Sequence, residues 1–305
     1  MRHYNARQIC EHCFASTRGP LSYQDCRQNA NHTLTSVSFQ CYLRTTNEKD
    51  RSPWSFFEDF ILEASKDDPQ HVLYNKGVAS DCVAAVIKSL CEDGVYGTGD
   101  LVSRINEAYV DFMQDDDAKK RDSHTPKPFS IRRLAISDRR KPTVACGYKH
   151  GQIRTMLHWC AKKTSQYQDT PLKQLRHRVV GNLSAFVHHL DSAGAMLTND
   201  ERDIALKYGV DFFDSFTLLH ELDVAHTLNL WTMRPKVHQL FHILDHLKIS
   251  NVNPLYQWAC WSEEDYMGKQ SKIVKACHPS ISGLHRALQR YVLYLHSDLL
   301  RSLLL

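Results

Sequence analysis

The N-terminal segment carries cysteines and a histidine at spacings typical of a zinc site. The C-x2-C pair lets one turn of the chain present two thiolates to a single ion. A third cysteine follows after twelve residues and a histidine after five more, which gives the pattern C-x2-C-x12-C-x5-H. Zinc prefers four thiolate or imidazole ligands in a tetrahedron. The pattern therefore predicts a structural zinc ion held by Cys10, Cys13, Cys26 and His32, with unlinked cysteines in a loop as the alternative.

Other residues offer alternative ligands. Cys41 or His12 could replace the third or the fourth ligand of this site. Farther along the chain, His238 and His242 stand at positions i and i+4, which on a helix is compatible with joint coordination. Gln239 occupies the position where a helical metalloprotease motif places its glutamate. For this histidine pair we prefer a structural role in the helix.

Two acidic segments lie far apart in the sequence. Residues 67–71 read Asp-Asp-Pro-Gln-His, and Glu263 and Glu264 follow an aromatic segment near the C-terminus. Carboxylates that a fold brings together can hold two divalent ions for phosphodiester chemistry. Taken locally, Asp68 is a turn residue before Pro69, and Glu264 is an acid at a helix N-terminus, where it suits the helix dipole.

Positive charge is concentrated in residues 121–163. This segment has eleven Lys or Arg against two Asp, nine net positive charges, while the whole chain has a net charge of +4. Such a concentration of charge attracts polyanions, of which nucleic acid is the commonest. A solvated, loop-rich linker is the alternative. We expect DNA contacts from Arg132, Arg133, Arg139, Arg140 and Lys141.

Apolar periodicity predicts a mainly α-helical protein with a small β component. Strands are expected only near 1–75 and around 253–261. We divide the chain into a loop-rich Cys/His module at 1–52 and a mainly helical domain at 53–305, which contains the basic segment 121–163. The predicted helices cover 78–90, 101–113, 151–163, 171–190, 198–225, 233–247 and 282–304.

The composition, 42% hydrophobic and 24% charged residues, is that of a soluble globular protein. No apolar run approaches the roughly 18 residues of a membrane span, and the N-terminus has no apolar signal core. We therefore expect a nuclear or cytoplasmic protein that is not secreted and does not bind a membrane. The sequence has no Walker loop, no G-x-G-x-x-G turn and no G-x-S-x-G elbow, which argues against nucleotide-cofactor enzymes and serine hydrolases.

The order of these segments resembles that of transposases of the CACTA (En/Spm-like) superfamily and related mobile-element proteins. A C-x2-C near the start is followed by D-x-x-H at 68–71, R-P-K-V-H at 234–238, and N-P-L-Y-Q-W with E-E-D-Y-M-G within 253–268. The resemblance covers roughly residues 10–75 and 230–280. It implies the remnant of a ribonuclease-H-like α/β core that carries a large helical insertion.

The resemblance also implies site residues and partners. Asp68 would be the second and Glu264 the third carboxylate ligand of a Mg²⁺ site, with Glu263 as a neighbour and His71 orienting Asp68. A first catalytic aspartate, expected upstream of Cys10, has no room in this chain. We therefore expect a DNA-binding fragment, truncated at its N-terminus, that cleaves little DNA alone and works as a homo-oligomer or by complementing another transposase subunit.

Two other functions are consistent with the same residues. The first alternative is a non-enzymatic helical interaction protein with a structural zinc hook, in which the acids are surface caps. The second is a histidine-rich metal enzyme on the helices of 220–246, which requires the histidine pair and an acid to converge in a pocket.

Overall fold

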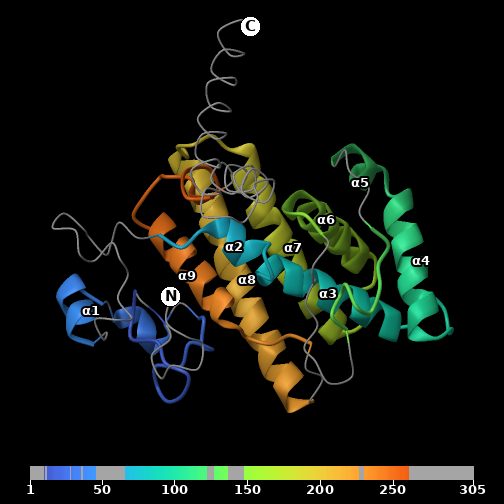
Figure 1. Ribbon diagram of the computed structural model, residues 1–305, viewed down its shortest axis with the longest axis horizontal. Helices are drawn as coiled ribbons and strands as arrows, with labels where there is room; N and C mark the ends of the chain where they lie inside the picture. The colour runs from blue at the N-terminus through green and yellow to red at the C-terminus, as the bar shows by residue number, and fades with distance from the viewer. Residues whose placement is uncertain are drawn as a thin grey trace, which may run out of the picture. The chain divides into compact units, whose positions relative to one another are not determined.

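The computed structural model describes residues 10, 12–27, 29–35, 37–45, 66–121, 127–136, 148–226 and 230–260 (Figure 1). The chain divides into two compact units, Met1–Ala259 and Cys260–Leu305, and every element below belongs to the first. The Cys/His module expected at 1–52 therefore shares a unit with the helices that follow it.

The described residues are mainly helical, which confirms this part of the prediction. They contain no sheet, and their only β pairing is two isolated bridges, Ser16–Ser22 and Met196–Val252. The ribonuclease-H-like core stays a prediction. In chain order the elements are η1 (Asn31–Leu34), α1 (Phe39–Thr45), α2 (Pro69–Leu73), α3 (Val78–Glu92), α4 (Leu101–Gln114), α5 (Asp116–Arg121), α6 (His150–Gln166), α7 (Pro171–Ser192), α8 (Asn199–Ala225), α9 (Pro235–Leu247) and α10 (Pro254–Gln257).

Local capping explains where several helices begin. The Asp100 side chain accepts a hydrogen bond from the first turn of α4, and Thr170 does the same for α7. Thr198 and Glu201 form a capping box at the start of α8. Six of the predicted helices lie within a few residues of α3, α4, α6, α7, α8 and α9, whereas the one at 282–304 lies outside the described residues.

The segment after α9 departs from the sequence prediction. A strand is expected around 253–261, but 254–257 form the short helix α10. The reason is local, because the Asn253 side chain accepts a hydrogen bond from the backbone N–H of Leu255 and Pro254 occupies the first turn. Both residues favour the start of a helix over an extended strand.

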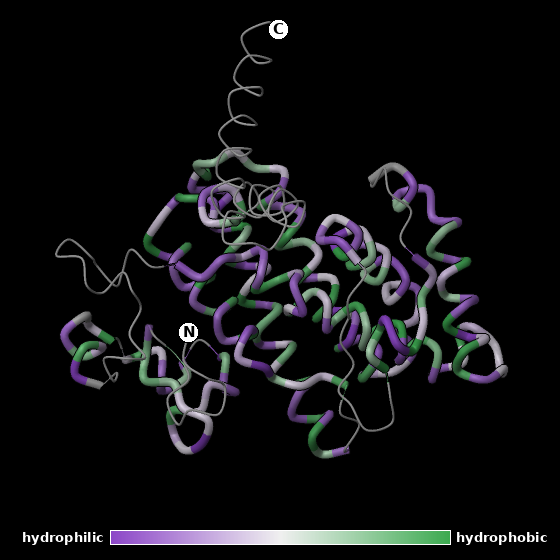
Figure 2. The backbone as a smooth tube through the Cα atoms, viewed as in Figure 1, coloured by the Kyte–Doolittle hydropathy of each residue, from purple (hydrophilic) through white to green (hydrophobic). Residues whose placement is uncertain are grey.

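The core lies between the long helices. α7 and α8 pack side by side, α6 packs on α7, and α3 packs on α6 (Figure 1). α3 is apolar almost all round, and its central residues Val83 to Ile87 are fully buried, as expected for a helix enclosed by others. Figure 2 shows the corresponding hydrophobic stretches on the helices that meet there. None of the described helices has the length and the apolar character needed to cross a membrane.

The described residues of the N-terminal segment, which lie within 10–45, have little regular structure besides η1 and α1 and contact the chain around α9. The Tyr23 hydroxyl lies 3.4 Å from the carbonyl oxygen of Met233, and the Cys26 Sγ lies 3.9 Å from the Met233 Sδ. The His32 ring packs edge-on against His238, with ring centroids 4.7 Å apart. These contacts place the C-x2-C loop beside α9.

Candidate metal centre

Two cysteines and two histidines converge between the N-terminal segment and α9. One ligand atom from each of Cys10, Cys13, His238 and His242 lies within 4.8 Å of the other three. The Sγ of Cys10 is 3.1 Å from the Nε2 of His242, the Sγ of Cys13 is 3.4 Å from the Nε2 of His238, and the two Nε2 atoms are 3.1 Å apart. Ligand atoms around a tetrahedral zinc ion are about 3.3–3.8 Å apart, given the usual Zn–N and Zn–S bond lengths. The spacing therefore fits one shared ion.

The C-x2-C loop is folded to present its sulfur atoms. The backbone N–H of His12 points to the Sγ of Cys10 at 3.3 Å, and that of Ala15 points to the Sγ of Cys13 at 3.4 Å. Amide donors aimed at sulfur stabilise the thiolate, which is the form that binds a metal. Both cysteines are buried. The loop thus offers two shielded sulfur atoms on one side.

α9 supplies the other two ligands from a single face. His238 and His242 are four residues apart, so their rings lie one helical turn apart on the same side. Other faces of α9 carry Leu240 and Leu244, which are buried in the main core. Because the core holds the helix, the two imidazoles are fixed before any ion arrives.

The electrostatics favour the metal-binding protonation state at two of the four groups, His238 and Cys13. Burial is the main cause that lowers the pKa of His238 well below its ordinary value, and the charge of the neighbouring His242 lowers it further. The His238 imidazole is therefore neutral. The hydrogen bond from Cys10 lowers the pKa of Cys13. Neutral imidazoles and thiolates are the forms that coordinate metals.

The hydrogen bond with Cys13 and burial raise the pKa of the Cys10 thiol above its ordinary value. Burial lowers the pKa of His242, but the hydrogen bond and charge of Cys10 outweigh it and raise this pKa overall. The proximity of the four ligand atoms means that the cluster could bind a metal such as zinc, and binding would displace the protons that Cys10 and His242 hold.

The structure brings together only part of the zinc site predicted from the sequence. Cys10 and Cys13 are in the cluster, but Cys26 and His32 are not. Cys26 is fully buried, with its Sγ 3.4 Å from the carbonyl oxygen of Tyr23, and burial raises the pKa of its thiol. The Nε2 of His32 lies 2.5 Å from the carbonyl oxygen of Asp25.

The other two members of the cluster are His238 and His242, for which we expected a structural role. Their spacing was visible in the sequence, and so was the C-x2-C. The missing information was that these two motifs meet, since Cys13 and His238 are 225 positions apart.

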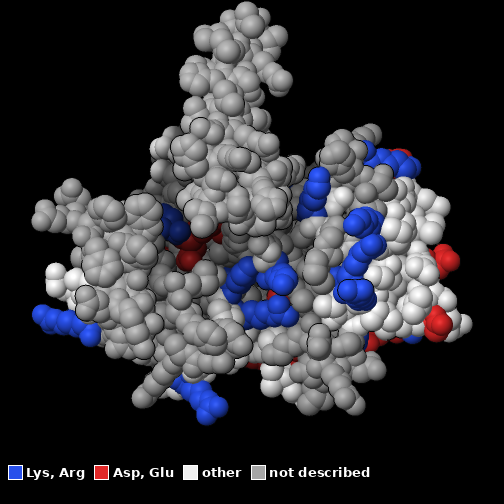
Figure 3. Space-filling model, viewed as in Figure 1, with Lys and Arg blue, Asp and Glu red and all other residues white. Residues whose placement is uncertain are grey.

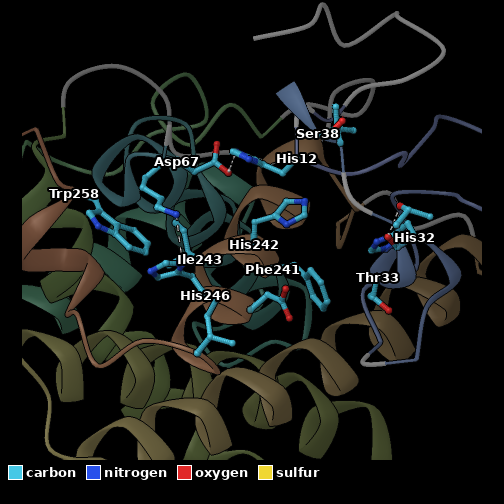
Figure 4. Close-up of a pocket in the computed structure, with 15 residues that line it drawn as sticks. His12, His32, Thr33, Ser38, Asp67, Phe241, His242, Ile243, His246 and Trp258 are labelled. Atoms are coloured by element: carbon cyan, nitrogen blue, oxygen red, sulfur yellow. Dashed lines mark hydrogen bonds and ion pairs between the residues drawn. The ribbon is translucent and has the colours of Figure 1, made fainter. Parts of the chain in front are cut away.

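A carboxylate joins the two ligand segments. The Nε2 of Gln239, on α9, donates a hydrogen bond of 2.9 Å to the Oδ1 of Asp67. The Nε2 of His12, in the C-x2-C loop, lies 3.5 Å from the Oδ2 of the same residue (Figure 4). Asp67 therefore contacts a residue between the two cysteines and a residue between the two histidines.

A cavity of about 630 Å³ opens beside the cluster. The N-terminal segment contributes His12, His32, Thr33, Thr35, Val37 and Ser38 to its lining. Lys66, Asp67, residues of α9 and Trp258 line the rest (Figure 4). The His246 ring packs edge-on against the Trp258 ring, with ring centroids 4.6 Å apart. The Lys66 Nζ lies 3.5 Å from the Nδ1 of His246. The volume is within the range of small-molecule pockets, about 300–1,000 Å³.

Of the two carboxylate segments predicted to bind Mg²⁺, the structure describes only the one that contains Asp68. Asp68 caps α2, because its Oδ1 accepts a hydrogen bond of 2.9 Å from the backbone N–H of Gln70. Its Oδ2 pairs with the Nδ1 of His71. These are the contacts expected of a turn residue before Pro69, and they also allow His71 to orient the carboxylate. Glu263 and Glu264 lie outside the described residues, so a shared Mg²⁺ site stays a prediction.

The basic segment is also described in part. Arg132 is exposed, and Arg133 donates a hydrogen bond of 2.8 Å to the carbonyl oxygen of Pro128. Arg139, Arg140 and Lys141 lie outside the described residues. Figure 3 shows Lys and Arg side chains gathered in the middle of the face in view.

Several cations on α6 have acidic partners. Lys162 contacts Asp115 at 2.7 Å and Asp117 at 3.2 Å. Lys163 contacts Asp111 at 2.6 Å, and Arg154 contacts Asp191 at 2.7 Å. The net charge of the segment therefore overstates the positive charge available to a polyanion in this part of the surface.

No family model, no curated protein and no solved structure matches this chain. The function therefore has to be inferred from the cluster, the cavity and the charged surface of the chain itself.

Proposed function

We propose that Cys10, Cys13, His238 and His242 hold a structural zinc ion that fastens the N-terminal segment to α9. The observation that carries this proposal is the approach of all four ligand atoms to within 4.8 Å of one another. A set of two sulfur and two nitrogen ligands in a tetrahedron suits zinc better than the metals that prefer oxygen or square-planar sites. Four protein ligands close the coordination shell, which is typical of structural zinc.

The N-terminal segment needs such a fastening. Among its described residues, Cys26 joins the main core, and the segment's own buried clusters are small: one contains Cys10, Cys13 and Ala15, and the other contains Val37 and Tyr42. Small modules with so little apolar burial usually depend on a metal or a disulfide. The apparent free energy of zinc binding to a site of this kind is roughly 10–16 kcal/mol. It adds to the free energy of folding because the site does not exist in the unfolded chain. When bound, the ion therefore supplies stability to this segment.

We further propose that this scaffold belongs to a transposase-like protein that binds DNA. The zinc centre would join the two stretches that carry the resemblance to CACTA transposases, roughly residues 10–75 and 230–280. The exposed Arg132 and the rest of the basic segment 121–163 would contact phosphates. A divalent ion at Asp68 and Glu264 belongs to the same proposal.

The zinc proposal is tested by metal analysis of the purified full-length chain. We expect one zinc ion per chain in the wild type and strong loss of zinc in Cys13→Ser and in His238→Ala. Cys41→Ser is the matched control, because Cys41 lies in α1 outside the cluster, and it should retain the ion. A wild-type chain that holds no zinc after refolding with the metal would refute the proposal.

The DNA proposal has its own test, the salt dependence of binding to a duplex. Neutralised phosphates release counterions, so affinity should fall steeply as salt is added. A chain that holds zinc but binds no DNA would instead support the helical interaction protein.

A further inference from the structure

Two side chains next to the metal ligands contact one carboxylate. His12 lies between Cys10 and Cys13 in the sequence, and Gln239 lies between His238 and His242. Their Nε2 atoms lie 3.5 Å and 2.9 Å from the two oxygens of Asp67. We propose that Asp67 is a positioning residue of the metal centre, which holds the cysteine loop and the histidine helix at the separation that one ion requires. This inference rests on the proposed zinc function.

Asp67 acts from outside the coordination shell. The cluster already offers four ligand atoms without it, which is the number that a tetrahedral zinc site needs. Its Oδ1 accepts the hydrogen bond from Gln239, and its Oδ2 faces His12. Outer groups of this kind orient the ligands, and their loss typically weakens metal binding about 10–100-fold.

The carboxylate is itself held firmly. Its side chain is only 13% exposed, so water competes weakly for its two contacts. The next residues start α2, which is attached to α9 by the Lys236 Nζ. This ammonium group donates a hydrogen bond of 2.7 Å to the carbonyl oxygen of His71 and another to that of Asn75. The backbone that carries Asp67 is therefore tied to the helix that carries the two histidines.

This arrangement explains how the C-x2-C loop is held beside α9. The core fixes His238 and His242, but the C-x2-C loop has few apolar contacts of its own. A contact between Asp67 and His12 keeps the loop near α9 when the ion is absent. Because the loop is then already partly ordered, metal binding costs less conformational entropy. The affinity for the metal is therefore higher.

The experiment measures the affinity of the full-length chain for Zn²⁺ and Co²⁺ by competition with a chromophoric chelator. Asp67→Ala should bind both ions about 10–100-fold more weakly than the wild type. Asp67→Asn should lose less, because its amide oxygen can still accept the hydrogen bond from Gln239. Asp93→Asn is the matched control: Asp93 is a partly buried carboxylate that pairs with Arg176 at 2.5 Å, and its loss should leave metal affinity unchanged.

Two further readouts separate positioning from general stability. With Co²⁺ at saturation, the ligand-field bands of Asp67→Ala should be weaker and shifted, whereas a variant that is merely less stable would give the wild-type spectrum. Gln239→Ala combined with Asp67→Ala should bind no more weakly than Asp67→Ala alone, because both changes remove the same hydrogen bond.

The outcomes distinguish the two proposals. If the wild type binds neither ion, the zinc function itself fails. If the wild type binds zinc and Asp67→Ala binds it equally well with the same Co²⁺ spectrum, the zinc function stands and the role of Asp67 is refuted.

Discussion

Gly209 on α8 lies directly against Leu244 on α9. A β-carbon at position 209 would come within 2.3 Å of the Leu244 Cδ1, closer than any unstrained contact. Leu244 is buried, so its side chain has little room to move away. The close approach of these two helices therefore depends on a glycine, and it helps to fix the helix that carries the two histidine ligands.

Gly209→Ala should destabilise the protein. Overpacking costs about 1–3 kcal/mol, while alanine gains at most about 1 kcal/mol in helix propensity. We expect a net loss on the order of 1–2 kcal/mol in the free energy of unfolding, measured by urea denaturation. Adding Leu244→Val should recover part of it. The control is Gly181→Ala on α7, where the nearest atom would be 3.4 Å away; an equal loss there would contradict the steric explanation.

Removal of the metal should release the N-terminal segment while the helical core stays folded. The segment depends on the cluster, whereas α6, α7 and α8 pack through a large apolar core of their own. With a chelator, trypsin should cut rapidly after the exposed Arg18 and Arg27, and the far-ultraviolet circular dichroism should change little. Added Zn²⁺ should restore protection. Cleavage at the same rate with and without the ion would argue against the fastening role.

Asp115 should make stability depend on acid pH. Its Oδ1 accepts from the backbone N–H groups of Asp117 and Ala118, and its Oδ2 pairs with Lys162. Burial alone raises the pKa of Asp115, but the hydrogen bonds from Lys162 and the amides outweigh it and lower the pKa overall. Because the pKa of Asp115 is lower in the folded state, its carboxylate stabilises the fold at pH values above its pKa in the unfolded chain, about 3.9. This stability is lost as the pH falls through the pKa of the folded state.

Asp115→Asn removes this contribution. It should reduce the free energy of unfolding by about 1 kcal/mol at pH 7, and its difference from the wild type should shrink as the pH falls below about 4. Urea denaturation at several pH values measures this. Asp116→Asn is the control, because this carboxylate is exposed and its pair with Lys119 should contribute little. A difference that persists unchanged to the lowest pH would count against the assignment.

Arg132→Ala should weaken DNA binding to all sequences alike. A phosphate contact carries no sequence information, so its loss should reduce the slope of log affinity against log salt by about 1. Fluorescence anisotropy over a range of salt concentrations gives both quantities. Lys162→Ala is the matched control, since Lys162 is engaged by Asp115 and Asp117. Equal slopes for Arg132→Ala and the wild type would exclude Arg132 from the interface.

Asn253→Asp should be strongly destabilising although the two side chains have the same shape. Asn253 is fully buried, and its Nδ2 donates to the carbonyl oxygens of Leu190 and Gly194 at 2.8 and 3.0 Å. In Asn253→Asp, the oxygen that replaces Nδ2 would face these two carbonyl oxygens without a donor, while the other oxygen would still accept from Leu255. We expect this to cost roughly 3 kcal/mol or more in the free energy of unfolding. Asn251→Asp, two residues away beside Arg202, should be nearly neutral in the same thermal or urea assay.

The helices could be predicted from the sequence because their causes are local. Apolar repeats and caps such as Thr198 with Glu201 lie within one or two turns of each other, and α8 begins where they indicate. The α10 turn differs from the strand expected around 253–261, although its cause, the Asn253 cap followed by Pro254, is also local.

For the candidate metal site, the sequence predicts the two motifs but not that they come together. The C-x2-C loop and the His238/His242 pair are each visible as spacings, but no short pattern says that they meet. Cys26 and His32 were chosen as partners because they are near in sequence. Their positions show why nearness was misleading: Cys26 is enclosed beside Met233, and the His32 ring packs against His238.

The cavity beside the cluster has one wall from the N-terminal segment and another from α9. A single bound ion would hold these walls in place, so filling the cavity and loading the metal become thermodynamically coupled events. A molecule that contacts both walls would raise the affinity of the protein for zinc. Bound zinc would raise the affinity for that molecule by the same factor. Screening for compounds that slow zinc release is therefore a direct route to whatever the cavity accommodates.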